Sequence, residues 1–492
     1  MNNQRGFLAN AVIYGLGGIA MQMASVILLP LYTHYLSPAE YGVLEILERT
    51  GQIVALLLLG NGIRMATFSF YCQAKTPLDR QRTFSAIAVV LWSILAFGML
   101  AGCLLAPYLA NWLEIDSPLL VVLGIAVVLL QGVVALPLAL MQARVESFRY
   151  VVASFSIAVA RMALVIAAVV WLGMGVWGVL AASAICFSVF GLALSTREVM
   201  KGFVKPDRSV AINILRFALP LLPSGIFALL LTTADRYFLL SFGSSADVGT
   251  YSLAYKLAAL IPALAVTPLW KVWTAKLYDV YILPDAPRAV GCMLWRLMVV
   301  RLFIVLGVCL FSAELVALVA PADYISAATL IPILAVASTL EFASTLSEGS
   351  FWSMRQTRWK PIIMAVSATT AGALLFILVP KYGGLGAALS IAAAYAVQAS
   401  VTFLVTQRVF HVAYDWRAIG IGVGTAVGLY FIGRSIDGGV LGALLKFGLW
   451  ASWPVLLWNF RALSDQDKEW TRRFVRRGRT AVHKILPARS MP

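Results

Sequence analysis

The feature that most constrains this chain is a succession of long apolar segments that covers almost its whole length. An α-helix needs about 20 apolar residues to cross a bilayer, and the connectors between these segments are short. We therefore predict an all-α polytopic membrane protein with about 14 transmembrane helices and no inserted soluble domain. The segments, with boundaries good to a few residues, are 8–30, 43–66, 83–106, 118–141, 150–172, 175–196, 213–240, 249–272, 290–312, 327–350, 361–380, 385–407, 417–434 and 438–458.

The composition supports this prediction. Hydrophobic residues make up 61% of the 492 residues and charged residues 12%, against about 45–50% and about 25% in soluble domains. A soluble chain this apolar could not cover its surface with polar groups. A soluble enzyme with one membrane anchor and a nucleic-acid-binding protein are therefore both excluded, despite the formal net charge of +16. The first segment lacks a following small-residue cleavage site, so we expect an uncleaved signal-anchor.

The basic residues are distributed unevenly among the connectors. With a cytoplasmic N-terminus, the cytoplasmic connectors and the tail hold 28 Lys and Arg residues, whereas the periplasmic connectors hold only Lys381 and Arg434. Lys and Arg near span ends favour the cytoplasmic side, so we predict that both termini are cytoplasmic. The tail, 459–492, is predicted to form a basic amphipathic helix. It would bind anionic phospholipids of the inner leaflet, or would serve only to fix the topology.

A short motif indicates an internal repeat. Ser37–Gly42 (SPAEYG) matches Ser244–Gly249 (SSADVG) at an offset of 207, and the same offset pairs Arg49 with Lys256. Six spans per half is an even number, so the two halves would have the same orientation, as in transporters with parallel repeats. We predict an N-lobe of spans 1–6 (1–200), a C-lobe of spans 7–12 (211–408) and two further spans, 13 and 14 (417–458).

Charged residues inside the predicted spans are the candidate functional groups, because each costs at least about 2.5–3.5 kcal/mol near the bilayer centre. Basic groups exceed acidic ones, which predicts a cavity that favours an anion such as a phosphate or pyrophosphate head group and disfavours an organic cation. The basic residues are Arg49, Arg64, Arg161, Arg236, Lys256, Arg296, Arg301 and Lys446, and the acidic residues are Glu45, Glu48, Asp235, Glu341 and Glu348.

Depth in the predicted spans sorts these residues into roles. The substrate-binding candidates of a cationic cavity are Arg49, Arg64, Arg161, Lys256 and Arg301, and the ion-coupling candidates are Glu45, Glu48 and Glu341. Alternatives remain open. Glu45 and Arg49, spaced i,i+4, would also simply neutralise each other, and Glu341 and Glu348 would either pair with basic groups or carry a proton. Asp235 and Arg236 are predicted to form structural ion pairs with neighbouring elements, because adjacent side chains point in different directions.

Metal and cofactor chemistry find no support in the sequence. The three histidines are scattered, and the five cysteines show no CxxC spacing. We therefore expect no metal site, no disulfide, no cofactor and no catalytic residues.

Two segments resemble the Wzx-type polysaccharide flippases, Ile27–Leu47 and, more specifically, Ala218–Leu257 with its paired prolines and its Asp235–Arg236 pair. Their superfamily also contains the MATE multidrug exporters and the lipid II flippases. The resemblance implies a transporter rather than an enzyme. It would move undecaprenyl-pyrophosphate-linked oligosaccharides from the cytoplasmic to the periplasmic leaflet of the bacterial inner membrane, by alternating access between two six-helix lobes. It also implies a role in O-antigen, exopolysaccharide or capsule assembly, alongside polymerase or chain-length machinery.

Three alternatives accompany this hypothesis. A MATE-type drug or cation antiporter shares the fold but predicts an acid-dominated cavity. A lipid II flippase shares the two extra C-terminal spans, which form a groove for the lipid tail in those proteins. A membrane glycan polymerase or ligase would carry a large external loop with catalytic Arg or His residues, whereas the external loops here are short.

Overall fold

The computed structural model describes most of the chain, and within the described residues the regular secondary structure is helical, without β-strands. Most of the first predicted span (8–26 of 8–30), residue Arg64 and almost all of the predicted tail helix lie outside the described residues. Those residues are 27–58, 70–71, 76–144, 146–200, 202–219, 222–281, 283–354, 356, 358–436, 439–460 and 462.

Long helices occupy every predicted span from the second onward. Ten helices in the described part are long and apolar enough to cross a membrane, which makes this a multi-pass membrane protein. The ten are α4 (Pro77–Trp112), α5 (Pro118–Ala143), α6 (Ser147–Ile166), α7 (Gly175–Met200), α9 (Leu222–Phe242), α11 (Ala286–Leu310), α13 (Ala327–Ser347), α15 (Trp359–Val409), α16 (Trp416–Arg434) and α17 (Val440–Asn459). Two other long helices, α2 (Pro38–Leu57) and α10 (Ser245–Tyr281), are not among these ten.

The element α15 contains two predicted spans, 361–380 and 385–407, which are separate helices as predicted. The two halves meet at a kink at Gly383, whose φ of 52° lies in the left-handed region that favours glycine. Shorter elements complete the fold. They are the π-helical turn η1 (Ala167–Trp171) after α6, α8 (Arg208–Ala218), α12 (Ser312–Val319), the 3₁₀ turn η3 (Ala322–Tyr324) and α14 (Gly349–Ser353).

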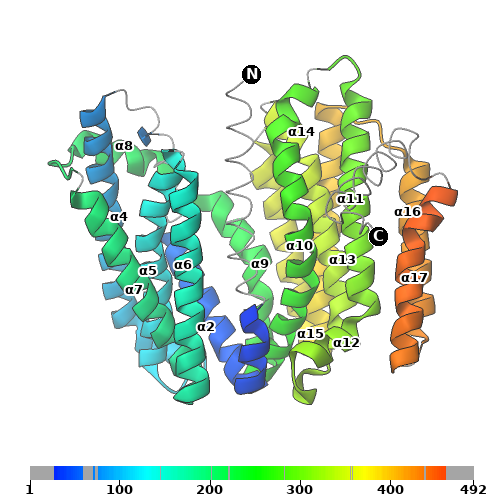
Figure 1. Cartoon of the computed structure of the whole chain (residues 1–492), viewed down its shortest axis with the longest axis horizontal. Coiled ribbons are helices and arrows are strands. Elements are labelled where there is room, and N and C mark those ends of the chain that lie inside the picture. The colour runs from blue at the N-terminus through cyan, green and yellow to red at the C-terminus, as the bar shows by residue number, and fades with distance from the viewer. Residues whose placement is uncertain are drawn as a thin grey trace, which may run out of the picture.

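The helices form two bundles, which Figure 1 shows side by side. Helices α2 and α4–α7 form the first, here called the N-lobe, and α9–α15 form the second, the C-lobe. They meet where α2 packs against α9 and α10. The amphipathic α8 connects them and lies against α4, with Ile214 buried beside Phe84 and Ile87. The predicted span 213–240 is therefore wrong at its start, because its first residues belong to this surface helix.

The two copies of the repeat motif begin their helices in the same way. At the start of α2, the Ser37 hydroxyl accepts the Glu40 N–H at 3.3 Å, and the Glu40 carboxylate accepts the Ser37 N–H at 2.9 Å. At the start of α10, Ser244 and Asp247 repeat this capping box at 3.2 and 3.0 Å. The matched sequences thus adopt matched structures, as a duplicated unit would.

The lobes touch most closely at the ends of these motifs. A Cβ atom on Gly42 would overlap the carbonyl oxygen of Ser245, and one on Gly249 would overlap that of Pro38. Only glycine allows the two helices to approach this closely. We call this contact, with Tyr41 and Tyr324 beside it, the seam, and the end of the molecule that carries it the seam end.

Two tyrosines pack together at the seam beside the glycine contact. Tyr41 and Tyr324 are both almost fully buried, with ring centroids 6.3 Å apart in an edge-to-face arrangement. Burial raises the pKa of the Tyr324 hydroxyl, and this protonated group donates a hydrogen bond of 3.1 Å to the carbonyl oxygen of Leu36. The seam therefore joins the first described helix, α2, α10 and the α12–α13 connector.

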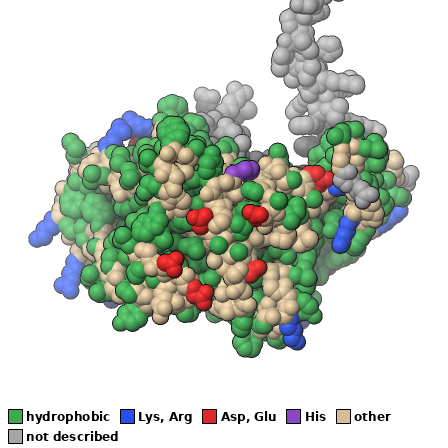
Figure 2. Space-filling model, turned by 90° about the horizontal axis from the view of Figure 1, so that it is seen from below, with side chains coloured by type: hydrophobic (Ala, Val, Ile, Leu, Met, Phe, Trp, Pro, Cys, Tyr) green, Lys and Arg blue, Asp and Glu red, His purple; other side chains and the backbone are tan. Residues whose placement is uncertain are grey.

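The two ends of the molecule differ in charge. Acidic side chains gather on the seam end, as Figure 2 shows. The exposed acidic residues of the connectors at this end are Glu40, Glu114, Asp116, Asp247 and Asp323. The opposite end, here called the basic end, carries the connectors with the basic residues Arg144, Arg197, Arg208, Arg358 and Arg408. This asymmetry follows the predicted division of the connectors into acidic and basic sets.

The helices α16 and α17 flank the C-lobe on the side away from the N-lobe (Figure 1). They pack on α11, where the Trp450 ring stacks on Phe303 at 4.4 Å and its indole N–H donates to the Phe303 carbonyl at 2.8 Å. Lys446 is buried there, and its ammonium group lies 2.6 Å from the Glu314 carboxylate. This ion pair ties α17 to α12.

Candidate substrate site

The site begins with a buried carboxylate between the lobes. Glu45 on α2 is 1% exposed, and the ammonium group of Lys256 on α10 forms an ion pair with its Oε1. The guanidinium of Arg49, one turn further along α2, lies 3.7 Å from its Oε2. The repeat-equivalent cations Arg49 and Lys256 thus come together at one carboxylate.

The two cations differ from their carboxylate in exposure. The side chains of Arg49 and Lys256 are 19% and 23% exposed, whereas that of Glu45 is covered. On the seam side, the buried ring of Tyr41 lies 5.1 Å from the Lys256 ammonium group. Both cations therefore keep part of their side chain exposed, whereas the carboxylate that they share does not.

Arg161 extends this cluster within the N-lobe. Its guanidinium lies 3.7 Å from the carboxylate of Glu48, one turn from Glu45 on α2, and its Nε donates to the Ser183 hydroxyl at 3.0 Å. The side chains of Arg161 and Glu48 are 25% and 32% exposed. We call the five residues Glu45, Glu48, Arg49, Arg161 and Lys256 the inter-lobe cluster. With three cations and two carboxylates, the inter-lobe cluster carries net charge +1.

The fourth described cation of the predicted set lies elsewhere. Arg301 on α11 is 4% exposed, donates a 2.8 Å hydrogen bond to the Ser338 carbonyl and packs over the Phe342 ring at 5.1 Å. Glu341 exerts an electrostatic attraction on it. The structure thus places Arg301 and Glu341 together inside the C-lobe, covered in this conformation, and not with the inter-lobe cluster.

Two acidic residues of the C-lobe form ion pairs within that lobe. Glu348 lies 2.7 Å from the ammonium group of Lys360. Asp235 and Arg236, both fully buried, pair with each other at 2.7 Å, because the long Arg236 side chain folds back. The expectation that they point in different directions is therefore wrong. The Tyr251 hydroxyl donates to Asp235 at 2.7 Å, and the Tyr255 ring lies 4.2 Å from the Arg236 guanidinium, which completes a closed structural group.

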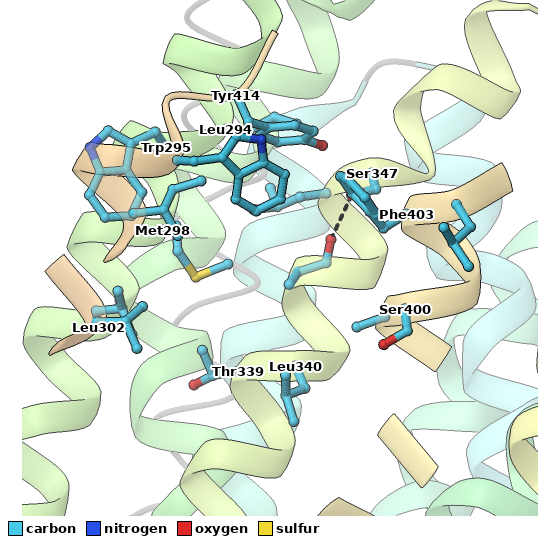
Figure 3. A pocket seen from close by; sticks show the side chains of 17 residues that line it. Leu294, Trp295, Met298, Leu302, Thr339, Leu340, Ser347, Ser400, Phe403 and Tyr414 are labelled. Carbon is cyan, nitrogen blue, oxygen red and sulfur yellow. Dashed lines mark hydrogen bonds between the residues drawn. The ribbon is translucent and has the colours of Figure 1, made fainter. Parts of the chain in front are cut away.

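A second feature is an apolar groove between the C-lobe and α16. It has a volume of about 530 Å³ and lies among α11, α13, α15 and α16, as Figure 3 shows. Aromatic and aliphatic side chains such as Trp295, Met298 and Phe403 line it. The hydroxyl of Ser347 donates to the Ala343 carbonyl at 3.0 Å, so this polar group does not make the groove hydrophilic. A cavity of this size and character suits a hydrocarbon chain.

Sequence comparison identifies the family. The family described as "Polysaccharide biosynthesis protein" matches residues 7–274, which is more than half of the chain. The chain belongs to this family. The matched range contains α2, α6 and most of α10, and these helices carry every residue of the inter-lobe cluster. No curated protein matches the chain.

Solved structures with a similar fold are membrane transporters. The lipid II flippase MurJ in an inward closed conformation superposes with a TM-score of 0.68 at 12% identity, over 92% of this chain and 99% of that chain. An inward-facing MATE family transporter gives 0.61 at 15% identity, over 81% and 98%. The MATE transporter VcmN of Vibrio cholerae gives 0.57 at 13% identity, over 82% and 96%. The fold is thus that of the flippases and MATE transporters, as predicted.

Proposed function

We propose that this protein is a flippase that moves undecaprenyl-pyrophosphate-linked oligosaccharide from the cytoplasmic to the periplasmic leaflet of the bacterial inner membrane, for assembly of a surface polysaccharide. The family and the fold support a polysaccharide-related transporter. The observation that carries the proposal is the inter-lobe cluster, in which Arg49 of one lobe and Lys256 of the other present partly exposed cationic groups to the same space.

The charge of the inter-lobe cluster suits a pyrophosphate. Guanidinium and ammonium groups make charge-assisted hydrogen bonds to phosphate oxygens, and Arg49, Arg161 and Lys256 together outnumber the two carboxylates. An organic cation would meet net repulsion at the same place. A site shared by both lobes also suits alternating access, because rocking of the lobes then changes the side from which the ligand is reached.

The apolar groove supports a lipid-linked substrate. A polyprenyl tail cannot follow the glycan between charged residues without losing its contact with lipid, so it needs an apolar path at the protein surface. The groove between α11, α13, α15 and α16 offers such a path, with Leu340, Phe403 and Trp416 in its lining. In the proposal the glycan and pyrophosphate cross between the lobes, and the tail remains in the groove or in the bilayer.

The predicted topology gives this conformation a direction. With both termini cytoplasmic, the basic end faces the cytoplasm and the seam end faces the periplasm. The closed seam then separates the inter-lobe cluster from the periplasm, so that a substrate would load from the cytoplasm. Net transport would be driven by an ion gradient, by the membrane potential or by consumption of the product, with Glu45, Glu48 and Glu341 as coupling candidates for an ion gradient.

A reconstituted assay tests the proposal. Proteoliposomes would carry undecaprenyl-pyrophosphate-linked oligosaccharide, and the fraction of glycan that reaches the opposite leaflet would be measured with an enzyme added outside. We expect Arg49→Gln and Lys256→Gln each to lower the initial rate about tenfold or more, since a hydrogen bond to a charged group contributes about 1.5–3 kcal/mol. Arg149→Gln is the matched control, because Arg149 is 58% exposed and pairs with Glu146 at a helix end. Rates equal to wild type in all three variants would refute the proposal.

A further inference from the structure

Glu45 forms an ion pair that connects the two lobes, which an acid that only neutralises a neighbouring charge would not need to do. Its carboxylate belongs to the N-lobe, and its ion-pair partner Lys256 belongs to the C-lobe. By contrast, the pair between Arg161 and Glu48 and the pair between Asp235 and Arg236 each lie within one lobe. The pair between Glu45 and Lys256 therefore breaks when the lobes separate at the seam, and the other two do not.

This pair is also close to the glycine contact. Glu45 lies three residues after Gly42 on α2, and Lys256 lies seven residues after Gly249 on α10. Residues three and seven positions apart share a helix face, so each charged residue continues the same face that its glycine presents at the seam. Closing the seam and forming the ion pair are thus coupled by geometry.

Glu45 does not use all the hydrogen-bonding groups of the two cations, so an anion with more oxygens could bind them more strongly. The distance of 3.7 Å between Arg49 and Glu45 Oε2 is too long for a hydrogen bond, and within the described residues neither that oxygen nor Arg49 Nε has a hydrogen-bond partner. A carboxylate offers one negative charge and two oxygens to the two cations. A pyrophosphate offers more of both, and the exposed parts of Arg49 and Lys256 are where it would first contact the two cations.

We propose that Glu45 acts as an internal anion that holds Lys256 and Arg49 when no substrate is bound, and that the pyrophosphate of the substrate replaces it and thereby releases the seam. This inference rests on the proposed function. When the seam is open, Lys256 is already separated from Glu45, so the ligand binds the cations without breaking the inter-lobe pair. When the seam is closed, binding must break that pair. The ligand therefore has a higher affinity for the open-seam state, which is what a shift of the equilibrium requires.

The inference assigns different roles to two acids on the same helix. Glu45 controls the opening of the seam, whereas Glu48, whose partner Arg161 is in its own lobe, does not. This role of Glu45 needs no ion gradient, because the displacing group is the substrate itself.

Spin-label distances across the seam test this inference. Tyr35 and Ile325 are 52% and 54% exposed, and they adjoin Leu36 and Tyr324, which the seam hydrogen bond joins. Labels introduced at these two positions would therefore report the opening of the seam in nanodiscs by double electron–electron resonance. We expect wild type to show mainly the short distance, and undecaprenyl pyrophosphate to raise the long-distance population. We expect Glu45→Gln to raise the ratio of open to closed seam about tenfold or more without ligand, and undecaprenyl pyrophosphate to add little further. Glu48→Gln removes an acid of the same helix whose partner lies in its own lobe, so it should keep the wild-type ratio of open to closed seam without ligand.

The outcomes separate this inference from the proposed function. If wild type opens with undecaprenyl pyrophosphate and Glu45→Gln behaves as wild type throughout, the role of Glu45 is refuted while the substrate class stands. If undecaprenyl pyrophosphate changes no distance in wild type, displacement is refuted whatever Glu45→Gln does. Lys256→Gln breaks the same pair from the other lobe, so it should also open the seam without ligand and serves if Glu45→Gln does not fold. A closed seam in that variant would overturn the inference.

Discussion

The glycine contact at the seam allows the two-state behaviour of the lobes to be tested by adding a single methyl group. In Gly249→Ala, the new Cβ would overlap the Pro38 carbonyl oxygen, so α2 and α10 must separate by on the order of 1 Å to restore van der Waals contact. The overlap exists only while the seam is closed. The substitution should therefore destabilise the closed-seam state and leave the open-seam state unaffected.

The expected magnitude follows from two opposing effects. Overpacking costs about 1–3 kcal/mol, and here it falls on one conformation. Alanine favours a helix over glycine by about 1 kcal/mol, but this gain applies to both conformations and cancels from their ratio. A difference of about 1–3 kcal/mol changes an equilibrium about 5–150-fold. We expect the ratio of open to closed seam to rise by that factor in Gly249→Ala.

The label pair at Tyr35 and Ile325 measures this ratio, and Gly372→Ala provides the control. A Cβ on Gly372 would meet no atom within 4 Å, so this variant gains helix propensity without a clash and should keep the wild-type distances. A Gly249→Ala protein with wild-type distances and undiminished stability would show that the glycine contact is not a constraint, and would refute the argument from close approach.

Three further predictions concern other parts of the molecule. Asp235→Asn leaves the Arg236 guanidinium buried without its partner and should destabilise the protein by about 3–5 kcal/mol, seen as a large fall in Tm, whereas replacing both residues by Leu should restore much of the loss. If the single variant unfolds at the wild-type temperature, the pair has no structural role. Ser400→Trp would fill the apolar groove and should slow transport of the lipid-linked glycan several-fold, while Leu389→Trp, at a lipid-exposed position of the same helix, should not; equal rates would exclude the groove as the tail path. Arg301→Gln should lower Tm and leave the affinity for undecaprenyl pyrophosphate unchanged, because this side chain is covered, and a weaker affinity at unchanged Tm would show that it contacts the ligand.

The succession of helices could be predicted because apolar length alone determines whether a segment crosses the bilayer. The helix ends could not, since hydropathy does not register a polar first turn. Helix α2 begins at Pro38 rather than at residue 43, because the capping box of Ser37 and Glu40 satisfies the first backbone N–H groups. The break inside α15 at Gly383 was predictable, because it falls in the predicted connector 381–384, where two glycines after Lys381 are typical of a turn.

The candidate site was predictable in part for a similar reason. The repeat offset showed that Arg49 and Lys256 are equivalent, and position along a span gave their depth. Hydropathy gives no information on the rotation of a helix, and rotation decides whether Arg301 faces the other lobe or α13. The pairing of Glu45 with Lys256, 211 residues apart in the chain, depends on the packing of α2 against α10. The seam tyrosines and the apolar groove also depend on packing, and no local pattern indicates them.

The most direct test of the central claim compares carriers that differ only in the linkage between lipid and glycan. Wild-type proteoliposomes would receive the same oligosaccharide on undecaprenyl pyrophosphate or on uncharged undecaprenol, and translocation of each would be measured in parallel. Because the inter-lobe cluster is cationic and shared by both lobes, we predict saturable translocation of the pyrophosphate-linked glycan and little of the uncharged one. Equal translocation of both lipids, unchanged in Lys256→Gln, would contradict the proposal that this protein recognises its substrate through the pyrophosphate.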